Sequence, residues 1–353
     1  MGKWIAAIVL VALLGGVGYA GVKLYPYYRL YSLRDSAALT LDEMEKKTIF
    51  IKSGSSLEDV ASFLDDKELL DDKESFLFFA KAKNYRKRRV VPGKYRIKGT
   101  MTYNSLVNHL RAGNGRLSVK VVFNSVANLK AMAEVVAKQI EPSEADLLKV
   151  LNDPAVHKKY GFSDKARFST MFLPDSYRMN WATTPQAFVK LMAQKYKKFW
   201  GPRNKAKAKR QKLTPTGASI LASIVQSEQS KRLDEWTKIA GLYLNRLKRG
   251  IKLEADPTVK FALGKPGLRR ILFKHLKVDS PYNTYRHHGL PPGPLRIPDK
   301  RAIRAVLNPM KHKYIFMCAK PEYSGYHNFS RTLRQHNRYA RMYHRWLRKE
   351  GIR

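Results

Sequence analysis

The sequence predicts an α+β protein in three parts: an N-terminal transmembrane helix, a small α+β module, and a mixed α/β domain with a glutamate on one of its helices. Three observations lead to this prediction. Residues 4–22 carry no charge, residues 49–123 alternate between strand-like and helix-like patterns, and residues 219–229 follow a helical pattern that contains a glutamate near its end.

The uncharged run from Trp4 to Val22 is rich in Ile, Val, Leu, Ala and Gly and lies between Lys3 and Lys23. As a helix it would be roughly 28 Å long, close to the hydrocarbon thickness of a bilayer. We therefore expect a membrane anchor at 1–23 and a polar stalk at 24–46. A cleaved signal peptide is the alternative, but the run is long for one and has no clean small-x-small cleavage site before Lys23.

The composition indicates an anionic partner. Lys and Arg number 68 against 28 Asp and Glu, so the net charge is 68 − 28 = +40. Nucleic acid, anionic lipid and acidic cell-wall polymer would all be attracted to such a surface. Two segments, Lys197–Lys212 and Arg338–Arg353, are especially basic and fit either a solvated surface or a polyanion-binding role.

Neither a metal nor a cofactor is expected. The nine histidines show no metal-ligand spacing, and the single cysteine, Cys318, rules out both a thiolate cluster and an internal disulfide. Cys318 lies in an apolar run, which is typical of a buried small side chain.

A module of about seventy residues is expected at 47–115. Its strand pattern at Thr48–Lys52 precedes a helical pattern that begins at Leu57. Further helices are expected at Ser75–Ala82 and Tyr103–Leu110, and a strand at Tyr95–Ile97. A second domain, 116–340, opens with the alternating strand Leu117–Phe123 and a helix that presents Leu129, Met132, Ala133, Val136 and Ile140 on one face, and a basic tail follows at 341–353.

The candidate acid is Glu228. Leu221, Ile224, Val225 and Glu228 stand at i, i+3, i+4 and i+7, so the carboxyl group shares the apolar face of its helix. Burial there would raise its pKa, as a general acid working near neutral pH requires. The alternative is that the last helical turn simply emerges into solvent.

Three Pro- or Gly-containing segments follow this helix, at Leu253–Val259, Ser280–Tyr285 and Gly289–Pro294. They carry aromatic and amide side chains suited to stacking on sugar rings and to hydrogen bonding. Loops of this kind on a helical scaffold commonly bind ligands.

Taken together, five motifs in order resemble those of the YceG-like (MltG) endolytic murein transglycosylases. They are Leu221–Glu228, Ala255–Val259, Tyr282–Tyr285, Gly289–Gly293, and His327–Phe329 with His336–Asn337. Phe172–Tyr177 resembles a further family segment, and residues 49–113 resemble the LysM-like part that precedes the catalytic domain. The family usually has two glutamates separated by one residue and followed by Thr, whereas this chain has Gln226, Glu228 and Gln229.

The resemblance implies a lytic transglycosylase with Glu228 as its catalytic acid and base. The acid protonates the bond between N-acetylmuramic acid and N-acetylglucosamine, and the muramic C6 hydroxyl then closes a 1,6-anhydro ring. The substrate-binding residues implied are Ser223, Gln226, Asp256, Thr258, Tyr282, Asn283, Thr284, Tyr285, His327, Asn328, His336 and Asn337. From the residues alone, Asp256 could instead orient a turn, and the His and Asn residues could hold the last strands together.

The implied partners are peptidoglycan strands, the bacterial cytoplasmic membrane and cell-wall synthases, with the catalytic body outside that membrane. Three alternatives remain: a non-catalytic wall-binding protein, a hydrolytic muramidase, and a membrane-anchored nucleic-acid binder suggested by charge alone. The last lacks an aromatic RNA-binding signature and zinc spacing, so no nucleic acid is expected as a partner.

Overall fold

The computed structural model describes residues 2–85, 90–113, 115–268 and 271–351. The chain forms two compact units, one made of 1–120, 139–141 and 178–183, the other of 121–138, 142–177 and 184–353. Helices are combined with strands that pair antiparallel, which confirms the α+β class.

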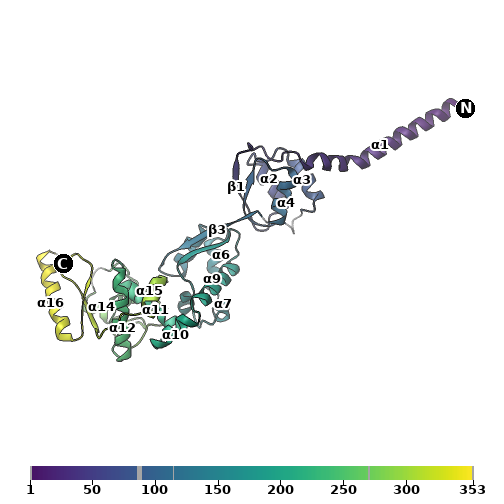
Figure 1. Ribbon diagram of the computed structural model, residues 1–353. Helices are drawn as coiled ribbons and strands as arrows, with labels where there is room; N and C mark the ends of the chain where they lie inside the picture. The colour runs from purple at the N-terminus through teal and green to yellow at the C-terminus, as the bar shows by residue number, and fades with distance from the viewer. Residues whose placement is uncertain (1, 86–89, 114, 269–270, 352–353) are drawn as a thin grey trace. The chain divides into compact units, whose positions relative to one another are not determined.

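Helix α1 (Gly2–Arg34) extends beyond the expected end of the anchor at residue 23 (Figure 1). Its last turns belong to the first unit, because Leu30 and Leu33 pack on that unit's core and the Arg29 guanidinium lies 4.7 Å from the ring centre of Phe78. The predicted stalk at 24–46 is therefore partly a docked helix, since the module partly covers Leu30 and Leu33. Among the described residues, no helix combines the length and the apolar character needed to cross a membrane.

The first unit is built on the antiparallel pair of β1 (Lys46–Ile51) and β2 (Gly93–Lys98), in which Ile49 lies opposite Tyr95. Between them come α2 (Leu57–Asp65) and α3 (Lys73–Ala82), and α4 (Tyr103–Ala112) follows β2. Ser56 caps α2 by accepting a hydrogen bond from the backbone N–H of Asp59. Apolar faces of all three helices pack with the strands in one core.

Strands β3 (Arg116–Phe123) and β4 (Asp175–Asn180) extend this sheet in the order β1-β2-β3-β4. The boundary between the units falls inside β3, after Lys120, a few residues beyond the expected start of the second domain at 116.

In the second unit, α11 (Pro215–Glu228) packs against α12 (Trp236–Lys248) and α15 (Lys300–Leu307). Residues 217–225 of α11 are buried, which explains why the sequence of this helix is almost wholly uncharged. The other helices and 3-10 turns of this unit are α5 (Leu129–Ala137), α6 (Glu144–Leu151), α7 (Pro154–Lys159), α8 (Lys165–Phe168), η2 (Ser169–Met171), α9 (Pro185–Phe199), α10 (Pro202–Arg210), η3 (Leu233–Glu235), α13 (Asp256–Ala262) and α14 (Phe273–Leu276).

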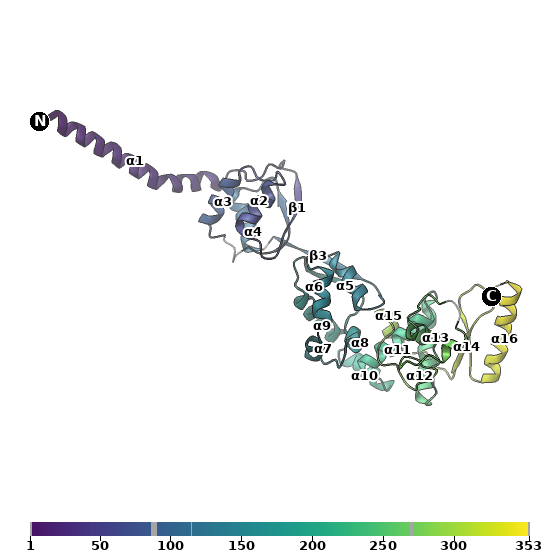
Figure 2. The same cartoon turned by 180° about the vertical axis from the view of Figure 1, so that it is seen from behind.

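At its C-terminal end, this unit carries the antiparallel hairpin of β5 (Phe316–Ala319) and β6 (His327–Ser330), against which α16 (Leu333–Lys349) packs (Figure 2). Helix α16 runs straight through the expected domain end at residue 340, because 333–349 contains neither Gly nor Pro. The expected tail is thus helical as far as Lys349, and residues 352–353 lie outside the described residues.

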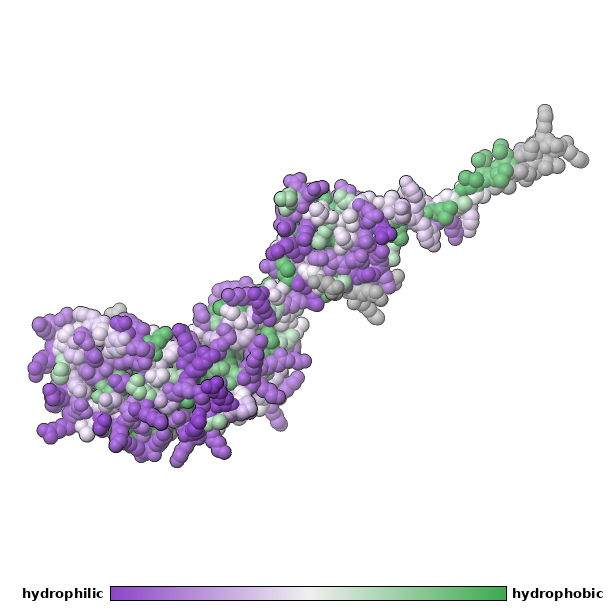
Figure 3. All heavy atoms as spheres, in the orientation of Figure 1, coloured by the Kyte–Doolittle hydropathy of each residue, from purple (hydrophilic) through white to green (hydrophobic). Residues whose placement is uncertain are grey.

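Both basic segments singled out from the sequence are helical. Lys197–Lys212 covers the end of α9 and all of α10, where Ala208 is buried in the core. Hydrophilic residues predominate on the visible face of the second unit (Figure 3), as the net charge leads one to expect.

Candidate active site

Glu228 is the last residue of α11, and its carboxyl group lines a cavity of about 440 Å³. The cavity lies between α11, α12, the start of α13, the β5–β6 hairpin and the start of α16. Its lining residues are Glu228, Leu242, Tyr243, Arg246, Leu253, Glu254, Asp256, Tyr285, Ile315, Phe316, Met317, Cys318, Ala319, His327, Leu333 and His336.

The surroundings of Glu228 favour its protonated form near neutral pH. Burial raises the pKa of Glu228 from 4.5 to about 7, and the nearby charge of Asp256 adds to the rise. A hydrogen bond from the Tyr243 hydroxyl to Glu228 Oε1, 2.6 Å long, acts in the opposite direction. The carboxyl group can therefore both give and take a proton at ordinary pH.

Two further carboxylates line the same cavity, and each has a fixed partner. Asp256 Oδ1 accepts a hydrogen bond of 2.7 Å from the Tyr285 hydroxyl. Glu254 is paired with Arg246, whose guanidinium is buried and also donates to two backbone carbonyl groups. Both carboxyl groups are thus held in place in the cavity that the candidate acid lines.

A second hydrogen-bonded group holds His327 at the cavity wall. Its Nδ1 lies 2.7 Å from Glu235 Oε2, and Gln229 Nε2 donates to the same carboxylate oxygen at 2.9 Å. Burial alone would raise the pKa of Glu235, but hydrogen bonds from the His327 side chain and backbone outweigh it and hold the pKa below its ordinary value. Gln229, which departs from the family pattern, is therefore part of this network.

His336 contributes an unpaired polar atom. Its ring is stacked 5.3 Å from that of Phe316, and its Nδ1 is buried without a hydrogen-bond partner in the described part of the chain. Burial and the nearby Arg246 lower the pKa of His336, so the ring is neutral near pH 7. A neutral ring nitrogen in the cavity can bond to a hydroxyl or amide group of a ligand.

The structure brings together five of the thirteen residues proposed from the sequence. Glu228, Asp256, Tyr285, His327 and His336 all line the cavity. Segments about 100 residues apart meet here because α11, α13 and the β5–β6 hairpin close around one space.

The other eight do not line this cavity. Five have structural partners: Ser223 accepts from the Leu295 N–H, Gln226 accepts from the Asp299 N–H, Thr258 and Thr284 are bonded to each other, and Asn283 donates to two loop carbonyls. Tyr282 lines a different cavity, Asn328 pairs with Cys318 in the hairpin, and Asn337 is exposed on α16. These polar side chains hold neighbouring backbone in place, because buried N–H and C=O groups need partners.

Sequence reasoning missed four residues of this site: Tyr243, Arg246, Glu254 and Glu235. Tyr243 has the spacing of a core residue on α12, and its contact with Glu228 depends on how α12 crosses α11. Glu235 stands directly before the helix that begins at Trp236, and this position was its one local signal. Its pairing with His327, 92 residues further along the chain, could not be seen in the sequence.

Comparison with known proteins identifies the family of this chain. The model of the YceG-like family matches residues 49–342. The chain belongs to the YceG-like family. The match extends from β1 into α16 and so includes every residue that lines the cavity.

Relatives of this YceG-like protein are named for an activity. The chain is 28% identical over 318 residues to the endolytic murein transglycosylase of Bacillus subtilis, covering 85% of this chain and 86% of that protein. It is 27% identical over 345 residues to the endolytic murein transglycosylase of Streptococcus pneumoniae D39, but spans only 60% of that longer protein. A crystal structure of a yceG-like protein from Listeria monocytogenes is similar with a TM-score of 0.52 and 27% identity, covering 84% of this chain and 99% of that one.

Proposed function

We propose that this YceG-like protein is an endolytic murein transglycosylase that cleaves the bond between N-acetylmuramic acid and N-acetylglucosamine in glycan strands. The observation that carries the proposal is Glu228: a carboxyl group with a pKa of about 7 at the wall of a cavity lined by polar and aromatic side chains. The names of the relatives support the same reaction.

In this mechanism, protonated Glu228 gives its proton to the glycosidic oxygen as the bond breaks. The resulting carboxylate then takes the proton of the muramic C6 hydroxyl, whose oxygen attacks C1 and closes the 1,6-anhydro ring. A pKa near 7 suits both steps, because neither protonation state is strongly disfavoured. Asp256 supplies a fixed negative charge in the same cavity, which favours the positive charge that develops at C1.

Replacing Glu228 by Gln tests the assignment, because Gln keeps the shape and loses the proton. We expect release of anhydro-muramyl products from uncrosslinked glycan to fall at least about 100-fold, with glycan binding retained. The control is Glu322→Gln, which removes an exposed carboxylate outside the cavity. Unchanged product release in the Glu228 variant would rule out the assigned acid.

The mass of the product separates transglycosylation from hydrolysis by a muramidase. Cyclisation leaves an end that is lighter by one water than the reducing end that hydrolysis leaves. Because Asp256 and Glu254 place further carboxylates in the cavity, a hydrolase using two carboxylates is the rival mechanism. Products with reducing ends, labelled in H₂¹⁸O, would favour it.

We further propose that α1 anchors the protein in the bacterial cytoplasmic membrane as a single span. The catalytic body would then lie on the outer side of this membrane, beside the cell-wall synthases that supply its glycan. Support comes from the uncharged run Trp4–Val22 and from the exposed apolar side chains of Leu13, Val17 and Val22, which are 61%, 70% and 75% exposed. Exposed apolar surface of this kind is stabilised by lipid.

The test compares the full chain with a chain that begins at Ser32. Full-length protein should stay with the membrane after alkaline extraction, and the shortened protein should be released. The LysM-like character of the first unit stays a prediction, and binding of residues 30–113 to purified glycan strands is the measurement that checks it.

A further inference from the structure

A second hollow lies on the other side of α12 from the candidate active site. Gly241, Leu244, Asn245 and Lys248 line it, whereas Leu242, Tyr243 and Arg246 face the active-site cavity. At about 100° per residue these two sets occupy opposite faces of the helix. The second hollow has a volume of about 490 Å³, and its other walls are α10, the end of α15 and the loop 308–312.

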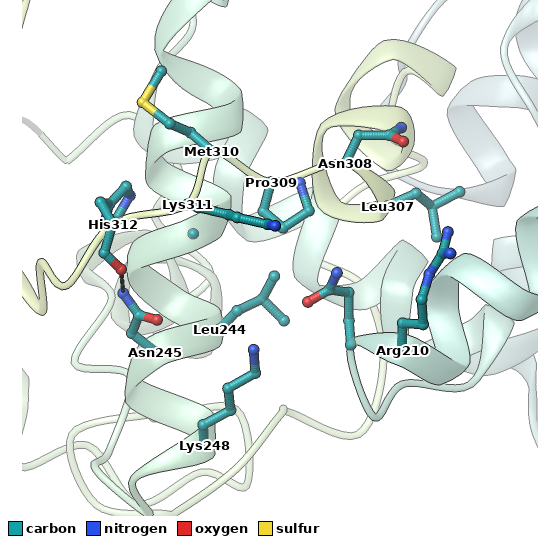
Figure 4. Close-up of a pocket in the computed structure, with 12 residues that line it drawn as sticks. Arg210, Leu244, Asn245, Lys248, Leu307, Asn308, Pro309, Met310, Lys311 and His312 are labelled. Carbon is teal, nitrogen blue, oxygen red and sulfur yellow. Dashed lines mark hydrogen bonds between the residues drawn. The ribbon is translucent and has the colours of Figure 1, made fainter.

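Cations gather in this hollow. Figure 4 shows Lys248 and Lys311 extending into it from α12 and from the loop after α15, with Arg210 across from them on α10. All three side chains are exposed, none is in an ion pair within the described ranges, and no Asp or Glu lines the hollow. Three cations are thus held near one another without compensating negative charge.

A neighbouring hollow of about 370 Å³ continues this surface along α10. It shares Asn308 with the first hollow and is lined by four further cations, Lys198, Arg203, Lys207 and Arg304, again without an acidic side chain. Lys207 donates to Asn308 Oδ1, which links the two hollows. The basic run that stood out in the sequence therefore forms a wall of both hollows, and we name the two adjoining hollows together the α10 groove.

We propose that the α10 groove binds a linear polymer that carries repeated anionic phosphate groups. Two adjacent concave sites along one helix fit a chain whose charges repeat, and a single small anion would fill only one of them. Arginine and lysine together favour phosphate, because the guanidinium fork bonds two phosphate oxygens and the ammonium group adds charge. The proposal does not depend on the catalytic role of Glu228.

A polymer in solution fits this surface better than a bilayer does. Binding at a lipid surface requires large apolar side chains that enter the headgroup region. Among the residues that line the two hollows, Met310 is the one large apolar side chain that is strongly exposed, at 49%. The groove thus offers charge in recesses but very little apolar surface to insert.

The test compares two triple variants of the full-length chain that lose the same charge. Arg210, Lys248 and Lys311 are changed to Gln in the groove variant. Lys158, Lys190 and Lys195, which are exposed on α7 and α9 and line neither hollow, are changed to Gln in the control. Binding of long-chain inorganic polyphosphate, of polyglutamate, and of phosphatidylglycerol vesicles is measured at fixed salt.

We expect the groove variant to bind polyphosphate roughly tenfold or more weakly than the wild type, and the control to change by less than about threefold. An equal loss in both variants would overturn the proposal, because overall charge would then explain the binding. Equal weakening of polyglutamate binding would overturn the preference for phosphate. A loss confined to vesicles would assign the groove to a membrane instead.

Folding is controlled by thermal unfolding of each variant. A further triple variant, Lys198→Gln with Arg203→Gln and Arg304→Gln, removes cations from the neighbouring hollow and leaves the hollow beside α12 unchanged. If the groove binds one continuous chain, this variant must also lose affinity for long polyphosphate. Unchanged affinity there would contradict a polymer that spans both hollows.

Discussion

Glu228→Gln should change the pH dependence of stability in a way that the structure allows one to calculate. The pKa of Glu228 is raised from 4.5 to about 7 by burial. Between these two pH values the folded protein keeps a proton that the unfolded chain has lost. Stability of the wild type therefore falls as the pH rises through this window, because the unfolded state binds fewer protons.

The difference between 4.5 and about 7, at about 1.4 kcal/mol per pKa unit, amounts to about 3 kcal/mol. The Gln side chain does not titrate and can still accept the Tyr243 hydrogen bond, so this penalty is absent from the variant. We expect the free energy of unfolding of the variant, minus that of the wild type, to rise by about 3 kcal/mol from pH 4 to pH 8.

Urea unfolding followed by tryptophan fluorescence measures this difference. Trp200 and Trp236 are buried in the same apolar cluster as α11, so they report on the unit that holds the site. Glu322→Gln, at an exposed carboxylate, should leave the pH dependence of the wild type unchanged. A difference that is flat between pH 4 and 8, or that falls, would refute the claim that burial keeps Glu228 protonated.

Three further predictions follow from single contacts. Tyr243→Phe removes the hydrogen bond that stabilises ionised Glu228, so the pKa of Glu228 should rise. The alkaline limb of the pH profile of kcat/KM for anhydro-product release should therefore move up by about one pH unit. A downward shift would contradict this. Glu235→Gln should lower the free energy of unfolding by about 1–3 kcal/mol at pH 7, because the bond to His327 loses its charge. The loss of unfolding free energy caused by this substitution should shrink as the pH falls below 4.5, because the wild-type carboxylate then gains a proton. Urea unfolding at pH 7 and at acidic pH measures the change. Gly241→Ala places a methyl group 2.5 Å from a backbone carbonyl of the loop after α15 and should destabilise the protein by about 1–3 kcal/mol in thermal unfolding.

Where a local pattern was clear, it predicted the element well. The helical spacing that begins at Leu57 corresponds to α2, the alternation at Leu117–Phe123 lies within β3, and Gly113 ends α4 with a φ of 67°. Each of these depends on neighbours within a few residues, through capping, periodicity or a left-handed backbone.

Element ends were less predictable where distant residues cover them. Helix α1 continues to Arg34 because the first unit packs on Leu30 and Leu33. A sequence window contains no information on such contacts, since the covering residues lie elsewhere in the chain.

By itself, the sequence determined which side chain is the candidate acid. Leu221, Ile224 and Val225 stand at i, i+3 and i+4 on one helix, so Glu228 at i+7 falls on their apolar face. Burial on that face would raise its pKa. Only the tertiary structure decided what surrounds it. Tyr243, Arg246 and His327 reach the cavity through the crossing of α12 over α11 and the return of the β5–β6 hairpin, and these approaches depend on the packing of whole faces, which no short stretch of sequence encodes.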